Sequence, residues 1–592
     1  MLIAKQTSVT WLIAVVTLLL IPVIYVLYLI SQAGEIPNFD YWWIVSRFYS
    51  TEGFSSDLRD WFFRNNEHIV LIPSLVYALN IVLTQGSNLG LCLFAFSFAA
   101  IQAILLVALL PQQVQQSVSL LVLVLFCVSV FNFTPAAAHN WMRGFSGTIW
   151  MGANLFVIAA IFCITRAVER LNVKPDRQYS YHAVSLPLGW VVGSFIFALL
   201  GMLNYSTALA VWPILCAIAL LFRFPRLLSG LYLGVSTLVL LLYFLTYETP
   251  PHHPELARLS FGEMLVYVPI YLGAIFTYQL QFAAFLGIVG LVASAIFAYY
   301  WFCLPRSHAF KVAWLPWLAI QTYTFGTALM AAVSRSGFGL GQARSSRYAS
   351  LPALFWLGLL VILIAFLVQQ FSGRLQGRSL LPLYAALGFL IWGMYGVGDE
   401  NYQEISRRAS LQPLVALSLQ MDAPDPTLVQ EVVGNRPEAF LGLAEALKRN
   451  QLVPFTRDIA QDNPCIPLDR ALDPNFLTAE PQSDVPGYFD AIALRTDIAG
   501  DRAIAQVTGW AKSANHGIRC IAILNQDNMV RGFALTGFSR PDVAETMGED
   551  YQWSGWKGYI RSSPEDRQLT AYAALKNRQS WVALQNPHPF PK

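Results

Sequence analysis

Charged residues are scarce in this chain. Asp, Glu, Lys and Arg make up 12% of its 592 residues, whereas 56% are hydrophobic and the mean hydropathy is +0.49. A soluble globular domain carries about 25% charged residues. The net charge of +3 and the lack of a basic stripe argue against a nucleic-acid partner. The composition excludes an ordinary soluble domain and predicts a polytopic α-helical membrane protein in contact with the lipid bilayer.

The seven cysteines lack the CxxC spacing of a zinc site. Five of them lie in apolar segments, where a thiol behaves as a small buried hydrophobe. Cys465 and Cys520 stand in the polar C-terminal part and could form a disulfide if that part lies outside the cytosol. The sequence leaves both the paired and the free state open.

Thirteen apolar segments occupy most of the first 400 residues. The first follows Lys5 and is long enough to be a retained helix with a cytoplasmic N-terminus rather than a cleaved signal. The segments are 11–30, 68–84, 88–110, 117–133, 149–165, 183–203, 206–222, 229–246, 263–281, 282–303, 312–333, 350–371 and 379–397.

Four loops rich in Lys and Arg test how many segments cross, since short cytoplasmic loops carry an excess of these residues. They lie near 166–177, 223–226, 306–311 and 374–378. If all thirteen segments cross, the first two of these loops face outside. If one segment among 68–133 and one among 263–303 only dip into the membrane or lie along its surface, eleven segments cross and all four loops face the cytoplasm. We therefore prefer eleven crossings. Either odd number predicts an inner (plasma) membrane protein whose C-terminal domain is periplasmic or extracellular.

The chain becomes polar after Val397. We expect a transmembrane domain over 1–397, a mostly helical connector over 398–484 and a soluble domain over 485–592. Short alternating runs predict strands in that last part, which we interpret as a jelly-roll-like β-sandwich. The runs are 491–494, 505–510, 519–524 and 530–535, with a hairpin connection at 525–528.

The interval between the first two apolar segments, an exoplasmic loop over 32–67 in this topology, carries Asp40 and Glu67 and ends before His68. Ionisable groups at a membrane edge are costly unless they are solvated or used. They therefore mark a candidate functional site.

Three further loops, 134–148, 248–262 and 334–349, fall on the same side of the membrane when eleven segments cross. The 334–349 loop combines arginines with glycines, and a guanidinium binds phosphate oxygens bidentately while glycine lets backbone N–H groups approach the anion. This loop predicts a site for a lipid phosphate. Its binding residues are Arg335, Arg347 and Tyr348, joined by His139, Asn140 and Arg143 of the 134–148 loop.

These residues resemble motifs of the GT-C glycosyltransferases, in a little-characterised bacterial branch, over roughly residues 1–400. The matching motifs are Asn38-Phe39-Asp40-Tyr41, Asn66-Glu67-His68, Asn140-Trp141, Tyr271-Leu272-Gly273, Arg335 and Ser346-Arg347-Tyr348. The tail resembles β-sandwich modules that accompany bacterial cell-envelope sugar proteins, which implies carbohydrate binding. Its motifs are Gly509-Trp510-Ala511, Arg540-Pro541-Asp542-Val543-Ala544 and Ser554-Gly555-Trp556.

The GT-C resemblance implies inverting transfer of a hexose or pentose from a polyprenyl-phosphate donor to a cell-envelope glycan, lipid or protein on the exoplasmic face. Asp40 would take the acceptor proton, and Arg335 and Arg347 would stabilise the leaving phosphate. Glu67 and His68 would orient the acceptor or support the loop of Asp40. The motifs make no cofactor certain, and a divalent cation held by Asp40, Glu67 and His68 stays open.

Several alternatives remain at this point. Asp40 could be only the N-cap of the amphipathic helix expected over 41–48, and Trp510 and Trp556 could be core residues of the sandwich. A lipid-linked sugar flippase or transporter would need ionisable residues or broken helices within its spans. An oligosaccharide ligase or polymerase would use the same donors, but its catalytic loop would come late in the chain.

Overall fold

The computed structural model describes residues 2–115, 117–171, 187–250, 260–303, 307–370, 381–434, 436–456, 468–478, 485–495, 503–513, 517–576 and 580–590. The chain divides into two compact units. Unit 1 comprises 1–33, 55–84 and 88–406, and unit 2 comprises 34–54, 85–87 and 407–592. Unit 2 thus includes the residues 34–54, which the sequence had assigned to the transmembrane domain.

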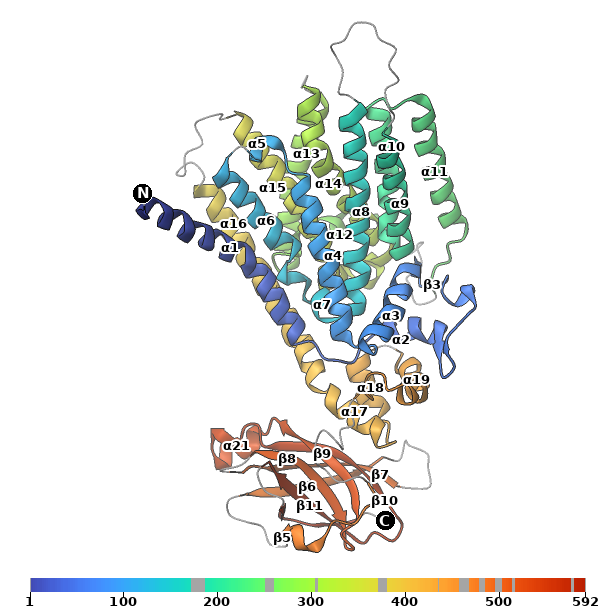
Figure 1. Cartoon of the computed structure of the whole chain (residues 1–592), viewed down its shortest axis with the longest axis vertical. Helices are drawn as coiled ribbons and strands as arrows, with labels where there is room; N and C mark the ends of the chain where they lie inside the picture. Colours follow the sequence, from blue (N-terminus) through green and yellow to red (C-terminus); the bar gives the residue numbers. More distant parts are fainter. Residues whose placement is uncertain are drawn as a thin grey trace. The chain divides into compact units, whose positions relative to one another are not determined.

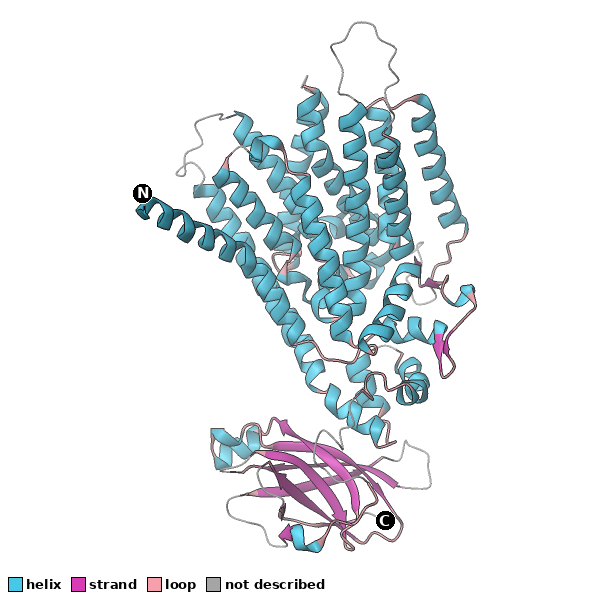
Figure 2. Ribbon diagram, viewed as in Figure 1, coloured by secondary structure: helices cyan, strands magenta, loops and turns pink. Residues whose placement is uncertain are grey.

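Unit 1 is built mainly from helices (Figures 1 and 2). Each of the thirteen predicted apolar segments contains a helix, because long apolar runs bury their backbone polar groups most cheaply in helical hydrogen bonds. These helices are α1 (Leu2–Ser31), α3 (Leu71–Thr84), α4 (Asn88–Ala108), α6 (Val118–Asn132), α8 (Gly144–Leu171), α9 (Leu188–Asn204), α10 (Val211–Leu221), α11 (Arg226–Leu245), α12 (Phe261–Gly273), α13 (Leu280–Cys303), α14 (His308–Arg335), α15 (Ser350–Gln370) and α16 (Leu381–Ser410). Short helices α5 (Gln112–Gln115) and α7 (Ala138–Met142) connect some of them.

Seven segments of the described chain are long and apolar enough to cross a membrane, judged by length and composition. This number is compatible with a multi-pass membrane protein. The segments are Asn88–Ala108, Val118–Met142, Gly144–Leu171, Arg226–Leu245, Leu280–Cys303, Ser350–Gln370 and Leu381–Gln420. Five other apolar helical segments are shorter, and parts of three basic loops used for the topology lie outside the described residues.

Helix α8 forms the centre of unit 1 and lies between α4 and α9 (Figure 1). Its first residue, Gly144, is packed so closely that an added Cβ would lie 2.6 Å from the backbone nitrogen of Cys92. The Gly144 N–H also donates to the Asn88 side chain at 2.8 Å. Small residues allow such close helix contacts within a membrane. This contact fixes the position of α7, the short helix that directly precedes α8.

The helical part of unit 2 joins distant parts of the chain. It contains α17 (Gln412–Gln420), α18 (Pro426–Val433), α19 (Pro437–Arg449) and α2 (Asp40–Phe48). Trp42 of α2 packs on Phe440 of α19 with ring centroids 4.6 Å apart, and the Gln412 side chain hydrogen-bonds both the N–H and the carbonyl of Ile36, at 2.7 and 3.0 Å. The apolar face of amphipathic α2 is therefore covered by α19, whose own apolar face needs the same cover.

The β-rich part of unit 2 is a single mostly antiparallel sheet with the order β5-β12-β11-β8-β9-β10-β7-β6, and β13 pairs with β11. Its strands are β5 (Leu477–Thr478), β6 (Gly487–Leu494), β7 (Ala503–Ala511), β8 (Ile518–Asn525), β9 (Val530–Phe538), β10 (Gly555–Ser562), β11 (Gln568–Leu575), β12 (Trp581–Ala583) and β13 (His588–Pro589). The four predicted strands and the hairpin between β8 and β9 are confirmed.

The described strands do not divide into the two facing sheets of the expected sandwich. Phe489 of β6 donates its N–H to the Gln585 carbonyl, and the Gln585 N–H donates to Gly487, both at 3.0 Å. One edge of the sheet thus meets the segment that follows β12, so the sheet curls into a half-barrel (Figure 2). Register shifts in four strand pairs explain the bending, because a bulge increases the local twist.

Two residues weighed in the sequence have different environments in this sheet. Trp556 is fully buried beside Phe489 in the core, whereas Trp510 is partly exposed. Cys520 is disulfide-bonded, and the other five described cysteines are free thiols. Cys465, the partner suggested by the sequence, lies outside the described residues.

Candidate functional site

A buried ion pair between Glu67 and Arg335 lies at the centre of the candidate site in unit 1. Glu67 follows Asn66, which has a φ of 54° in the turn between β3 (Arg64–Asn65) and β4 (His68–Ile69). Asn tolerates this left-handed conformation better than most residues. Arg335 is the last residue of α14, and the two side chains are only 7% and 13% exposed. The Glu67 carbonyl also accepts from the Tyr243 hydroxyl at 2.9 Å.

His68 connects this ion pair to residues at the end of α9 in unit 1. Its Nε2 lies 3.3 Å from Glu67 Oε1, and its Nδ1 contacts the Ser206 hydroxyl. The imidazole stacks on the Tyr205 ring with centroids 3.6 Å apart. Tyr205 and Ser206 lie at the end of α9, so His68 is held between the turn and the helices.

Burial and charge set the protonation of the two neighbours. Burial opposes the ionised form of Glu67, but His68 and the Arg335 guanidinium hold the pKa of this carboxyl well below its usual range. Burial also lowers the pKa of His68, Glu67 offsets this in part, and Arg335 and Arg347 lower it further. The site therefore presents a carboxylate and a neutral imidazole at neutral pH.

Arg347 and Tyr348 adjoin the ion pair. Arg347 donates to the Tyr348 hydroxyl at 3.2 Å, and its carbonyl accepts from the Asn140 amide at 2.9 Å. Burial opposes ionisation of the Tyr348 phenol, but Arg347 and Arg335 together lower its pKa. Both arginines also lower the pKa of His68. Arg347 is an exposed residue and Arg335 a largely buried one, and both lower the pKa values of the buried His68 and Tyr348.

Aromatic rings form the wall of this region. Trp150 of α8 contacts both Tyr205 and Tyr348, with centroid distances of 4.8 and 5.3 Å, and Tyr271 of α12 lies 5.4 Å from Tyr348. Such a wall excludes water and strengthens the electrostatic interactions inside it. Arg335 and Glu67 therefore interact in a largely apolar surrounding.

A second charged cluster involves His139, Arg143 and Glu404. Arg143 Nη2 lies 3.2 Å from Glu404 Oε1, His139 Nε2 lies 3.5 Å from Glu404 Oε2, and the Glu404 side chain is 46% exposed. Burial lowers the pKa of His139 to about 4, and Arg143 and Arg347 act in the same direction. The 134–148 loop is therefore part of the same site.

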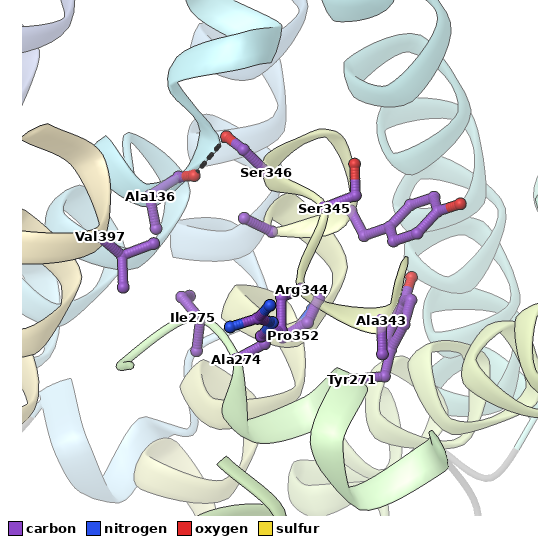
Figure 3. A pocket seen from close by; sticks show the side chains of 12 residues that line it. Ala136, Tyr271, Ala274, Ile275, Ala343, Arg344, Ser345, Ser346, Pro352 and Val397 are labelled. Atoms are coloured by element: carbon purple, nitrogen blue, oxygen red, sulfur yellow. Dashed lines mark hydrogen bonds between the residues drawn. The ribbon is translucent and has the colours of Figure 1, made fainter. Parts of the chain in front are cut away.

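A small pocket adjoins Tyr348 and has a volume of about 230 Å³, open solvent included. Figure 3 shows Arg344 and Tyr271 on its wall, with Ser346 bonded to the Ala136 carbonyl. Arg344 also donates to the Tyr278 carbonyl. Small apolar residues make up most of the remaining lining. The pocket thus offers an apolar space with one cation beside the buried cluster.

The structure therefore brings together eight of the nine residues that the sequence singled out. They are Glu67, His68, His139, Asn140, Arg143, Arg335, Arg347 and Tyr348. Asp40 belongs to unit 2. It is the first residue of α2, and the N-cap position is taken by Phe39 with a φ of 55°. The capping role considered for Asp40 is therefore wrong, although an acid in the first turn still suits the helix dipole.

Five residues of the site were not found from the sequence. Four of them, Trp150, Tyr205, Ser206 and Tyr243, sit in or beside apolar segments and give no polar pattern. Glu404 follows the last apolar segment, and the helical spacing of buried Val397, Asn401 and Ile405 was the signal that α16 continues toward it. No group of three His, Cys, Asp or Glu residues that could hold a metal ion occurs in the described part of the chain.

A fall in pH is expected to destabilise the protein through His68. Its pKa is near 6.5 in an unfolded chain and lower in the fold. The unfolded state therefore binds more protons below pH 6.5, so the stability present above this value is lost as the pH falls toward the folded pKa. The unfolding temperature of the detergent-solubilised protein, measured from pH 8 to pH 5, should decline less in His68→Gln than in the wild type.

The exposed His308 provides the matched control, since His308→Gln should keep the pH dependence of the wild type. Identical slopes for the wild type and His68→Gln would show that His68 is not buried in its neutral form.

In comparisons with known proteins, the chain matches no family model, no curated protein and no solved structure.

Proposed function

We propose that this protein is an inverting glycosyltransferase that moves a sugar from a polyprenyl-phosphate donor to a cell-envelope acceptor on the exoplasmic face of the membrane. The observation that carries the proposal is the convergence of the exposed Arg347 with the largely buried Arg335, Glu67 and His68, beside a group of aromatic rings in an apolar helical unit. A phosphate attached to a lipid is the anion that such a unit would meet.

The reaction needs positive charge at the leaving group. The acceptor oxygen forms a bond to the anomeric carbon as the bond from that carbon to the phosphate oxygen breaks, and negative charge grows on the phosphate. Arg347 would bind this phosphate, with Arg335 beside it. Because the surrounding rings lower the local dielectric, the largely buried Arg335 guanidinium would stabilise the charge more strongly than it would in water.

The acceptor proton needs a base. Glu67 is a poor candidate, because a carboxylate whose pKa is held low by His68 and the Arg335 guanidinium has little tendency to take a proton. We therefore keep Asp40 as the proposed base, as the resemblance implies, and assign Glu67 the task of orienting Arg335. His68 would hold Glu67 in place through its contact with Ser206.

The test is a transfer assay with the full chain in lipid nanodiscs and a panel of polyprenyl-phosphate-linked hexoses and pentoses. We expect release of polyprenyl phosphate and a product of inverted anomeric configuration. Arg347→Ala should raise the KM for the donor far more than the KM for the acceptor. Arg59→Ala, at a 90% exposed side chain outside the site, is the matched control.

Movement of lipid-linked sugars across proteoliposomes without release of polyprenyl phosphate would contradict the transferase and support a flippase. Equal effects of Arg347→Ala on donor and acceptor would remove Arg347 from phosphate binding.

A further inference from the structure

Four residues from four strands form one row on the half-barrel of unit 2. Phe538 of β9 pairs with Gly555 of β10, Gly555 pairs with Trp510 of β7, and Trp510 pairs with Tyr488 of β6. Side chains alternate between the two faces of a strand. The row therefore lies on one face of the sheet and runs across the strands.

This face points away from the core. The residues next to the row in sequence, Phe489, Ala511 and Trp556, are buried in the hydrophobic core of the sheet. Tyr488 is 37% exposed, and Trp510 and Phe538 are partly exposed. Aromatic side chains that remain open on a folded unit are a mark of a binding surface.

A polar rim borders the aromatic row. Arg540 lies over Gly555, where an added Cβ would come within 2.9 Å of its Cγ. Its guanidinium pairs with Asp490 at 2.5 Å and with Asp542 at 2.7 Å. The missing side chain at Gly555 thus lets a planar, hydrogen-bonding group cross the row between two aromatic rings.

The other side of Trp510 is supported by a loop. The Tyr551 ring meets the Trp510 indole edge-on, with centroids 6.0 Å apart, and the Lys512 ammonium lies 4.5 Å from the centre of the Tyr551 ring. Lys512 also donates to the Asp550 carbonyl at 2.7 Å. The indole is therefore held in place before any ligand arrives, which reduces the entropy lost on binding.

We propose that the row of Tyr488, Trp510 and Phe538 binds a neutral, linear glycan of equatorially linked pyranoses, lying across the strands. Such sugars present flat C–H faces that stack on aromatic rings, and their hydroxyls hydrogen-bond to planar side chains such as Arg540 and Asp490. Neighbouring strands lie about 4.8 Å apart, close to the length of one pyranose ring. Each step along the row thus corresponds to one sugar.

The charge around the row favours a neutral ligand. Three cations, Arg540, Lys512 and Lys557, face three carboxylates, Asp490, Asp542 and Asp550. An anionic lipid surface or a nucleic acid would need an excess of cations. This site stands on unit 2 alone and does not depend on the transferase activity.

The test is calorimetric titration of the full chain in nanodiscs with cellohexaose and chitohexaose, and with the curved α-linked maltohexaose for comparison. We expect at least one of the two β-linked hexasaccharides to bind more tightly than maltohexaose. Trp510→Ala should weaken binding by about tenfold or more, corresponding to about 1.4 kcal/mol. Trp510→Phe, which keeps an aromatic ring, should retain most of it.

Two controls separate binding from folding. Phe476→Ala removes an exposed ring of unit 2 outside the row and should leave affinity unchanged. Tyr488→Ala alters an exposed position and should weaken binding without lowering the unfolding temperature. No binding of either β-linked hexasaccharide, or equal affinity of the wild type, Trp510→Ala and Tyr488→Ala, would overturn the proposal. Binding of the row to protein-free phospholipid vesicles in place of the sugars would overturn it as well.

Discussion

Replacing Arg335 by alanine is expected to destabilise unit 1 by about 3 to 5 kcal/mol and to abolish donor use. The substitution leaves Glu67 as a buried carboxylate without its guanidinium partner, and an uncompensated buried charge is costly. It also removes one of the two cations proposed to meet the phosphate. Thermal unfolding in detergent measures the first effect, and the transfer assay measures the second.

The double variant Arg335→Ala/Glu67→Gln distinguishes the two effects. Removing both charges eliminates the buried carboxylate, so most of the stability should return. Donor use should not return, because the cation is still absent. A double variant that recovers both stability and transfer would show that Arg335 serves the fold alone.

Asp40→Asn is expected to lower the rate of transfer by about 10² to 10⁴, the usual contribution of a general base. The change should cost less than about 1 kcal/mol of stability, because an acid in the first turn of a helix gains about that much from the helix dipole. The rate is measured at saturating donor and acceptor, and the unfolding temperature confirms that the fold is intact.

Glu52→Gln is the matched control, since Glu52 is another carboxylate of the same interval and lies between β1 (Tyr49–Ser50) and β2 (Gly53–Phe54). It should keep the full rate. An unchanged rate in Asp40→Asn would remove Asp40 from the role of base and leave Glu67 and Glu404 as the carboxylates to examine.

The sequence predicted the elements of this fold better than their pairing. The length of the apolar runs identified every long helix of unit 1, and the alternation of apolar and polar residues identified β6 to β9. Alternation does not say which strand edges meet, however, so the hydrogen bonds between Phe489 and Gln585 that curl the sheet had no signal. The packing of Trp42 on Phe440 was equally hidden, because each residue belongs to an amphipathic helix that could have found another partner.

The site shows the same limit. Glu67 and Arg335 stand out because each is a charged residue at the end of an apolar segment. The arginines of the 334–349 loop predicted a binding site for an anion. Their direct ion pair joins positions 268 residues apart, which no local pattern specifies. Tyr205 contributes its ring and Ser206 its hydroxyl from a segment whose composition is otherwise apolar, so their roles follow only from packing around His68.

The packing of α2 against α19 has a consequence for biosynthesis. The ribosome makes Trp42 early, whereas its partner Phe440 emerges roughly 20 to 80 s later at the usual rates of translation. During that time the apolar face of α2 has no permanent cover. A nascent chain arrested before residue 437 should therefore expose this helix to protease, and a truncation that removes the C-terminal third should do so permanently.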